Sequence, residues 1–298
     1  MPELPEVESI RRSLVPRLLG RTIVGATLLR RDILIAPGDP PGGFPRQRAS
    51  SRKRPAPITP ADLLQGATIT DLIRRGKQLA VIAAHSDRAL VVQLGMTGHL
   101  EFFPGAPTLP RPHVHAHWSL DSAAAVHFHD PRRFGALRLF RSVAALYEHW
   151  SALGPDALTI TPDQLHGALA NANRPIKAAL LDQAVLAGVG NIYADESLHL
   201  AGINPRIRAR RLRSAQLESL AAAIRAVLTQ AVAAGGSTLR DYADSDGRPG
   251  SFQTRHAVYG RAGEPCRVCA RPLASALLAQ RTTVWCRDCQ PARNRGIR

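Results

Sequence analysis

The chain has 298 residues, of which 45% are hydrophobic, so it is long enough to bury two hydrophobic cores or a single large one. Its 39 Lys and Arg residues outnumber its 23 Asp and Glu residues, which gives a formal net charge of +16. This charge favours a polyanionic partner such as nucleic acid, the alternative being a basic protein whose charge only aids solubility. No apolar run approaches the roughly 20 residues of a membrane helix, and the acidic N-terminus does not resemble a secretory signal, so we expect an intracellular protein without membrane contact.

The first predicted element is an amphipathic helix over residues 3–18. Apolar residues recur at helical spacing from Leu4 to Leu18. Pro5 suits a first helical turn, and Glu3 and Glu6 lie where the helix dipole favours anions. The sequence therefore predicts a helix that buries one face.

Short β-like runs follow between about residues 22 and 139. Examples are TIVGATLL, QLAVIAA, ALVVQL, AAVHFH and ALRLF, separated by Gly, Pro and Asp, as expected for a β-sandwich or barrel. Residues 36–60 interrupt this pattern with seven prolines and a basic cluster, which predicts a flexible loop. Such an insertion either adds non-specific phosphate contacts or is merely solvated.

The pattern becomes helical after LGPDAL (153–158), which is typical of a hinge. Helical segments are predicted at 161–172, 176–188, 192–202 and 214–234, with GVGN (188–191) as a tight glycine turn between two of them. The fold class is therefore α+β with several domains.

All four cysteines lie near the C-terminus: Cys266, Cys269, Cys286 and Cys289. Two C-x2-C pairs separated by 16 residues match the four-cysteine zinc ribbon, and four thiolates complete a tetrahedral structural site. We predict one structural Zn²⁺ per chain; two disulfides are the alternative.

Several sequence blocks resemble the formamidopyrimidine-DNA glycosylase family. They occur in the family's order and span nearly the whole chain: PELPEVE (2–8), QLGMTG (93–98), DPRRFG (130–135), GVGNIYADE (188–196), GGSTLRDYADSDGRPGSF (235–252), VYGRAGEPC (258–266) and the terminal cysteines. The resemblance implies a catalytic β-sandwich domain with a docked helix over 1–152, a helix–two-turns–helix domain over 153–258 and a zinc finger over 259–298.

The resemblance also implies a bifunctional glycosylase and lyase of base excision repair. Pro2, once it is N-terminal, is the amine that attacks the sugar C1′, expels the base and forms an iminium, whose electron-withdrawing effect permits β- and δ-elimination. Glu3 is the proton donor to the opening sugar. Lys77, at a hairpin tip, is the proton donor for β-elimination, and Arg281 donates for δ-elimination and grips phosphate.

The implied substrate is double-stranded DNA that contains an oxidised purine, 8-oxoguanine or a formamidopyrimidine. Glu6 lines the lesion pocket, and residues 235–252 form a mobile lid over the base. Met96, Arg132 and Phe134 fill the helix after the damaged nucleotide is flipped out. Further implied DNA contacts come from His113, Lys177 and Asn191.

Two features depart from the family pattern. Gln93 stands where the family usually has histidine; it can donate a hydrogen bond to phosphate but carries no charge. The insertion at 36–60 is longer than we expect. Neither departure affects Pro2 or Glu3.

Three alternatives remain beside the purine-specific enzyme. An endonuclease VIII-type glycosylase for oxidised pyrimidines typically begins Pro-Glu-Gly, whereas this chain has Pro2-Glu3-Leu4. A non-catalytic damaged-DNA-binding relative would not need Pro2, Glu3 and Lys77 together, and a simple zinc-ribbon module would not explain the first 250 or so residues. We expect a monomer in a bacterial cytoplasm, associated with the nucleoid through DNA.

Overall fold

The computed structural model describes residues 2–35, 58–84, 87–105, 107, 111–239 and 242–292. The chain forms two compact units, Met1–Ala152 with Gly235–Gly250, and Leu153–Ala234 with Ser251–Arg298. Most of the insertion at 36–60, which the sequence predicts to be a flexible loop, lies outside the described residues. No helix in the described ranges is long and apolar enough to cross a membrane.

The first unit contains two antiparallel four-stranded sheets with the strand orders β1-β6-β7-β5 and β2-β3-β4-β8. This agrees with the predicted sandwich. The strands are β1 (Ile23–Leu28), β2 (Ile69–Arg75), β3 (Gln78–Ala83), β4 (Ala89–Gln93), β5 (His99–Phe103), β6 (Val114–Leu120), β7 (Ala125–His129) and β8 (Ala136–Phe140). In the part of this unit that the structure describes, the 3₁₀ turns η1 (Arg31–Ile33) and η3 (Pro60–Leu63) lie outside the sheets.

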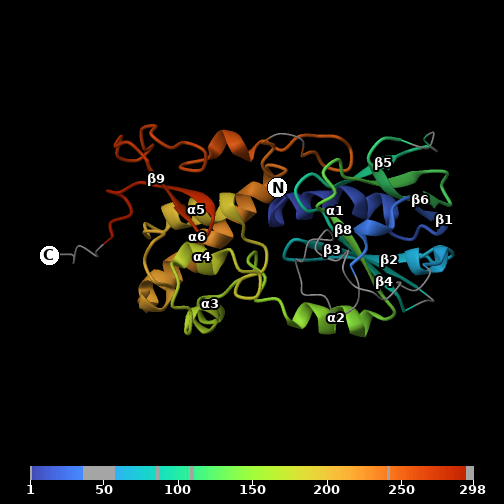
Figure 1. Ribbon diagram of the computed structural model, residues 1–298, viewed down its shortest axis with the longest axis horizontal. Helices are drawn as coiled ribbons and strands as arrows, with labels where there is room; N and C mark the ends of the chain where they lie inside the picture. The colour runs from blue at the N-terminus through green and yellow to red at the C-terminus, as the bar shows by residue number, and fades with distance from the viewer. Residues whose placement is uncertain are drawn as a thin grey trace. The chain divides into compact units, whose positions relative to one another are not determined.

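Helix α1 (Leu4–Leu18) packs against β2, β3 and β5 (Figure 1). Leu4, Val7, Ile10 and Leu14 are each 0% exposed, as the helical spacing of apolar residues predicts. Most of these side chains join one core cluster with residues of both sheets. Burial of this helix face therefore holds the N-terminus of the chain against the sandwich.

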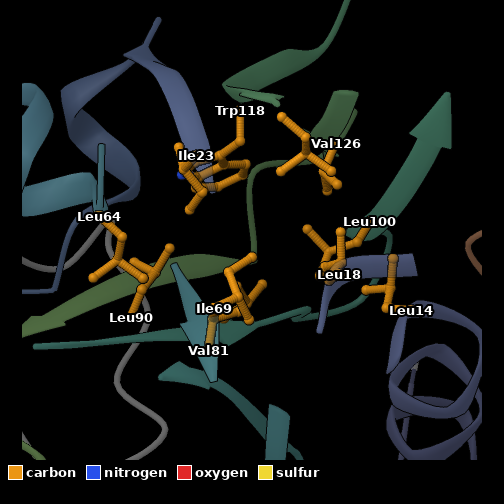
Figure 2. Close-up of a pocket in the computed structure, with 12 residues that line it drawn as sticks. Leu14, Leu18, Ile23, Leu64, Ile69, Val81, Leu90, Leu100, Trp118 and Val126 are labelled. Atoms are coloured by element: carbon orange, nitrogen blue, oxygen red, sulfur yellow. The ribbon is translucent and has the colours of Figure 1, made fainter. Parts of the chain in front are cut away.

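The core between the sheets contains a small apolar cavity of about 30 Å³. Figure 2 shows Leu14, Ile69, Val81, Leu100 and Trp118 among the side chains that surround it. The space exceeds the roughly 10–15 Å³ that one water needs, but these apolar side chains offer a water few hydrogen-bond partners. It is a packing defect of the core and not a ligand site.

Helix α2 (Val143–Ser151) ends the first unit and was not predicted from the sequence. Ser142 caps it by accepting a hydrogen bond from the Ala145 N–H. Trp150 Nε1 donates to Gln78 Oε1 over 2.8 Å, and both residues are buried. This bond connects α2 to the start of β3.

The second unit contains the helices α3 (Pro162–Leu169), α4 (Ile176–Leu180), α5 (Asn191–Leu200) and α6 (Ser214–Ala233), with the 3₁₀ turns η4 (Ala209–Arg211) and η5 (Phe252–Arg255). The predicted helix over 176–188 is wrong beyond Leu180. Gln183 explains the difference: its side chain accepts from the Gly188 N–H and donates to the carbonyls of Leu181 and Val189. These bonds replace the helical backbone bonds.

The cysteine region forms a hairpin of β9 (Ala274–Leu278) and β10 (Arg281–Trp285). Ala279 and Gln280 turn between the strands with φ of 47° and 57°. Strand β10 packs on α5, where the Val284 N–H donates to Asp195 Oδ2 over 3.1 Å. The hairpin is therefore anchored within the second unit.

Candidate functional site

Pro2 and Glu3 are both buried immediately before α1. Glu3 is the N-cap residue and is 1% exposed. Its backbone N–H donates to Glu6 Oε2 over 2.8 Å, and the Glu3 side chain accepts from the Glu6 N–H in a reciprocal capping box. The fold thus holds a proline and a carboxylate side by side at the N-terminus of a rigid helix.

Glu6 joins α1 to the segment 235–250. Its Oε1 accepts a hydrogen bond of 2.7 Å from the Ser237 N–H, and its carbonyl accepts from the Tyr242 hydroxyl over 3.1 Å. Gly236 has φ of +85°, and a Cβ placed there would lie 2.7 Å from Glu6 Oε1. A glycine is needed at 236 because the turn and the carboxylate are in direct contact.

The rest of this segment also contacts the first unit, although the sequence placed it in the second domain. The Ser245 and Ser13 hydroxyls are 2.6 Å apart, and the Phe102 N–H donates to the Ser245 carbonyl over 2.9 Å. Arg17 pairs with Asp246 over 2.7 Å. Residues 240 and 241 lie outside the described residues. Residues 235–239 and 242–250 of the predicted lid are part of the first compact unit, which also contains α1 and β5.

Lys77 lies in the turn between β2 and β3, which agrees with the position inferred from its motif. Arg74, near the end of β2, contacts Glu8 Oε2 over 3.1 Å and donates to the Gly76 carbonyl over 3.1 Å. Burial alone raises the pKa of Glu8, but hydrogen bonds from Arg11 and other arginine contacts outweigh it and lower the pKa to about 2. Glu8 therefore remains ionised and ties the Lys77 turn to α1.

Asp130, which is 0% exposed, connects the loop that contains Thr97 to the loop that contains Gly135. Asp130 accepts from the Thr97 hydroxyl and from the Gly135 N–H, each over 2.6 Å. The Arg132 Cζ lies 4.9 Å from the centre of the Phe134 ring. The fold thus places Arg132 and Phe134 together, beside the loop that carries Met96.

The side chains of these loops are accessible to different degrees. Met96 and Phe134 are half-buried and Arg132 is exposed, so none of them belongs to the core. His113 is exposed, and its carbonyl accepts from the Asp130 N–H over 2.9 Å. Gln93 is half-buried at the end of β4.

Lys177 does not lie where a direct phosphate contact requires it. Its side chain is 0% exposed, and Nζ lies 2.7 Å from Asp195 Oδ1 and 2.8 Å from Thr283 Oγ1. Burial raises the pKa of Asp195 to about 7, an effect that the Lys177 charge opposes. The inferred phosphate contact of Lys177 is wrong for this conformation, because its ammonium group is enclosed by α5 and β10.

Asn191 and Arg281 lie near the surface of the second unit. Asn191 is the first residue of α5, and its Nδ2 donates to the Thr282 carbonyl over 3.2 Å. Arg281 is exposed at the start of β10, directly before Thr282. Asn191 and Arg281 therefore both lie next to Thr282.

The sequence analysis missed Asp195, whose place in a helical motif gave no sign that it would pair with Lys177.

The four cysteines form a cluster of free thiols, all within 4.8 Å of one another. Cys266 Sγ lies 3.9 Å from Cys289 Sγ, and Cys269 Sγ lies 3.4 Å from Cys286 Sγ. These separations exceed the roughly 2.05 Å of a disulfide, so the alternative of two disulfides is wrong. Sulfurs about 2.3 Å from a tetrahedral ion lie roughly 3.8 Å apart, so the donor set fits a metal ion.

Comparisons with known proteins agree along almost the whole chain. Residues 1–137 match the formamidopyrimidine-DNA glycosylase N-terminal domain, and residues 152–243 match the formamidopyrimidine-DNA glycosylase H2TH domain. A formamidopyrimidine-DNA glycosylase of Xanthomonas oryzae pv. oryzae is 44% identical over 292 residues, which cover 97% of this chain and 100% of the relative.

Solved structures of this family also match nearly the whole chain. MutM (Fpg) from Thermus thermophilus is 40% identical with a TM-score of 0.78, covering 97% of this chain and 98% of that chain. A mutant of the Lactococcus lactis Fpg, in complex with a Fapy-dG containing DNA, is 28% identical with a TM-score of 0.81, covering 97% of this chain and 100% of that chain.

Proposed function

Because the chain belongs to the formamidopyrimidine-DNA glycosylase family, we propose that it excises oxidised purines and then cleaves the DNA strand through its own Pro2 amine. As a member of this family it is a DNA-binding glycosylase of base excision repair. The observation that carries the proposed Pro2 mechanism is the buried Pro2-Glu3 pair at the N-terminus of α1.

In the proposed mechanism, Pro2 is the mature N-terminus and its nitrogen bonds to C1′ as the base leaves. Glu3, one residue away, donates a proton to the sugar-ring oxygen so that the ring opens. The resulting iminium acidifies the 2′ proton, and loss of this proton expels the 3′ phosphate. A second elimination releases the 5′ phosphate, and hydrolysis of the iminium regenerates Pro2.

We assign Lys77 and Arg281 to the elimination steps. Lys77 is a proton donor during β-elimination, a role supported by the network that holds its turn against α1. Arg281 grips phosphate and donates during δ-elimination; its exposure at the start of β10 allows the guanidinium to reach DNA. Each role needs a cation that faces phosphate oxygens.

The lesion pocket in this proposal is formed by Glu6 and the lid over residues 235–252. The buried carboxylate is already bonded to Ser237 N–H, so movement of the lid and orientation of Glu6 are coupled. Purine specificity is supported by the Leu4-Pro5 continuation of the N-terminal motif.

The remaining assignments concern DNA contacts and domains. Met96, Arg132 and Phe134 replace the flipped nucleotide, while His113 and Asn191 contact phosphates. Lys177 supports the backbone at Thr282 instead of contacting DNA. We assign residues 1–152 to the catalytic domain, 153–258 to the helix–two-turns–helix domain and 259–298 to the zinc finger of a monomer, except that the segment 235–250 packs with the catalytic unit.

We assign Zn²⁺ to the four cysteines. Four thiolates occupy all tetrahedral positions, so the ion would stabilise the hairpin and take no part in the reaction. Its affinity would contribute directly to the stability of the finger.

The test of this function is a panel of duplexes that each carry one lesion. We expect cleavage at 8-oxoguanine and formamidopyrimidine with a phosphate on both sides of the gap, and little cleavage at thymine glycol. Preferential cleavage at thymine glycol would identify the pyrimidine-specific alternative. Binding to every lesion without release of any base would identify a non-catalytic relative.

A further inference from the structure

One face of the sheet β1-β6-β7-β5 carries a row of histidines that the glycosylase mechanism does not use. His99 on β5 lies directly opposite His129 on β7, and Glu101 on β5 lies opposite His127. His127 in turn lies opposite His117 on β6. The pleat of the sheet places all of these side chains on one face, away from core residues such as Phe128.

We propose that His99, Glu101 and His129 form a second metal site, for a divalent ion of the Zn²⁺ class. Each of these residues offers a ligand atom, and the three atoms lie within 4.8 Å of one another. Ligands about 2.0–2.2 Å from a tetrahedral ion are roughly 3.4 Å apart, so a shift of about 1 Å completes the site. Imidazole and carboxylate are donors that suit Zn²⁺ and related transition metals.

The surroundings of the donors favour ligation. His99 Nδ1 lies 3.3 Å from the Thr97 carbonyl, which orients the ring so that Nε2 lies 3.1 Å from Glu101 Oε1. A backbone carbonyl that holds one ring nitrogen is the usual support of a metal-binding histidine. Among the described residues, His129 Nδ1 and both ring nitrogens of His127 are buried without a hydrogen-bond partner. Buried ring nitrogens are costly unless a hydrogen-bond partner or a metal ion satisfies them.

The competing arrangement is an ion pair between protonated His99 and Glu101. It would account for the 3.1 Å contact but gives His129 no role. Arg111 also competes for the carboxylate, since its Nη1 lies 3.4 Å from Glu101 Oε2. If the three residues bind a metal ion, removal of Arg111 should strengthen metal binding. If they form only an ion pair, removal of Arg111 should weaken the charge network and should not create metal affinity.

The proposed metal site lies next to the hydrogen bond between Thr97 and Asp130. His99 follows Thr97 by two residues and His129 directly precedes Asp130, and these two neighbours are hydrogen-bonded over 2.6 Å. An ion bound here would link β5 to β7 at the base of the loops that carry Met96 and Arg132.

The experiment measures zinc per chain after equilibrium dialysis of the full-length holoprotein. We expect about two ions, one for each of the two candidate groups, and loss of only one in His99→Gln and His129→Gln. The control His166→Gln, an exposed position on α3, should retain both. Arg111→Met should bind the second ion at least about tenfold more tightly, a gain that general destabilisation cannot produce.

Cobalt substitution gives an independent readout. The second equivalent of Co²⁺ should add weak visible bands without a further sulfur charge-transfer band, because its ligands are nitrogen and oxygen. A single zinc ion per chain in the wild type, or two ions retained in both histidine variants, would overturn the proposal. So would an Arg111→Met variant that binds no more tightly than the wild type.

Discussion

The Ser237 N–H donates to Glu6 Oε1 over 2.7 Å, and this bond joins residues separated by 231 positions in the chain. Because Glu6 also accepts from the Glu3 N–H, a short path of hydrogen bonds runs from the segment 235–250 to the cap of α1. The order of the segment 235–250 and the position of Glu3, the N-cap residue of α1, are thus physically connected.

Gly236→Ala should lower the rate of base excision by about tenfold or more, because the new Cβ would lie 2.7 Å from Glu6 Oε1. Cleavage at a preformed abasic site, which has no base to recognise, should change much less. Single-turnover kinetics on both substrates measure the two effects.

Gly247→Ala is the matched control. Gly247 has a comparable φ of +79°, but a Cβ there would meet nothing within 4 Å. Alanine at position 247 would therefore have the same backbone strain as alanine at position 236 but would not contact Glu6. Equal loss of excision in the two variants would show that strain alone is responsible.

Glu8→Gln should remove part of the acid sensitivity of the protein. The pKa of Glu8 is lowered from 4.5 to about 2, so its contribution to stability is present above pH 4.5 and is lost as the pH falls toward 2. This contribution is at most about 3 kcal/mol. We expect the urea midpoint of the wild type to approach that of Glu8→Gln between pH 5 and pH 3.

Release of metal at low pH affects every variant, so the difference between variants is the informative quantity. Glu218→Gln, at an exposed position on α6, should remain parallel to the wild type. A constant difference between the wild type and Glu8→Gln over this pH range would show that the arginine contacts do not hold Glu8 ionised.

Lys177→Met should destabilise the second unit by about 3–5 kcal/mol, since it leaves Asp195 buried without its 2.7 Å partner. Lys177→Met combined with Asp195→Asn should recover much of this loss. Thermal unfolding measures both.

The folded double variant also tests the role of Lys177 in DNA binding. Each phosphate contact that is lost reduces the slope of log K against log salt by about one. We expect an unchanged slope because Lys177 is enclosed. A slope reduced by about one would restore the direct phosphate contact inferred from the sequence.

Chelation of the proposed Zn²⁺, or Cys269→Ser, should unfold the β9–β10 hairpin, since the small cluster around Val258, Leu273 and Val284 is a weak core by itself. Arg281 lies on this hairpin, so DNA cleavage should fall while the β-sandwich stays folded. Metal content, near-ultraviolet circular dichroism and strand cleavage report these effects. Full activity in a metal-free protein would contradict a structural role for the ion.

The sequence predicted the features that depend on local pattern. Helix α1 and the strand runs follow from periodic burial, and the cysteine cluster follows from spacing. The motif blocks identified the family. The sequence did not predict the end of α4 at Leu180, because hydrogen bonds from Gln183 override helix propensity there. Nor did it predict the enclosure of Lys177, which depends on a partner strand more than 100 residues away in the chain.

Trapping with borohydride is the most direct test of the central claim that the Pro2 nitrogen bonds to the sugar. The protein is mixed with a duplex that contains 8-oxoguanine, reduced, digested and analysed by mass spectrometry. The account predicts a deoxyribose adduct on an N-terminal peptide that begins at Pro2, and little trapping in Pro2→Gly. An adduct on Lys77 or another internal residue of the wild type, or a peptide that retains Met1 in the active enzyme, would contradict it.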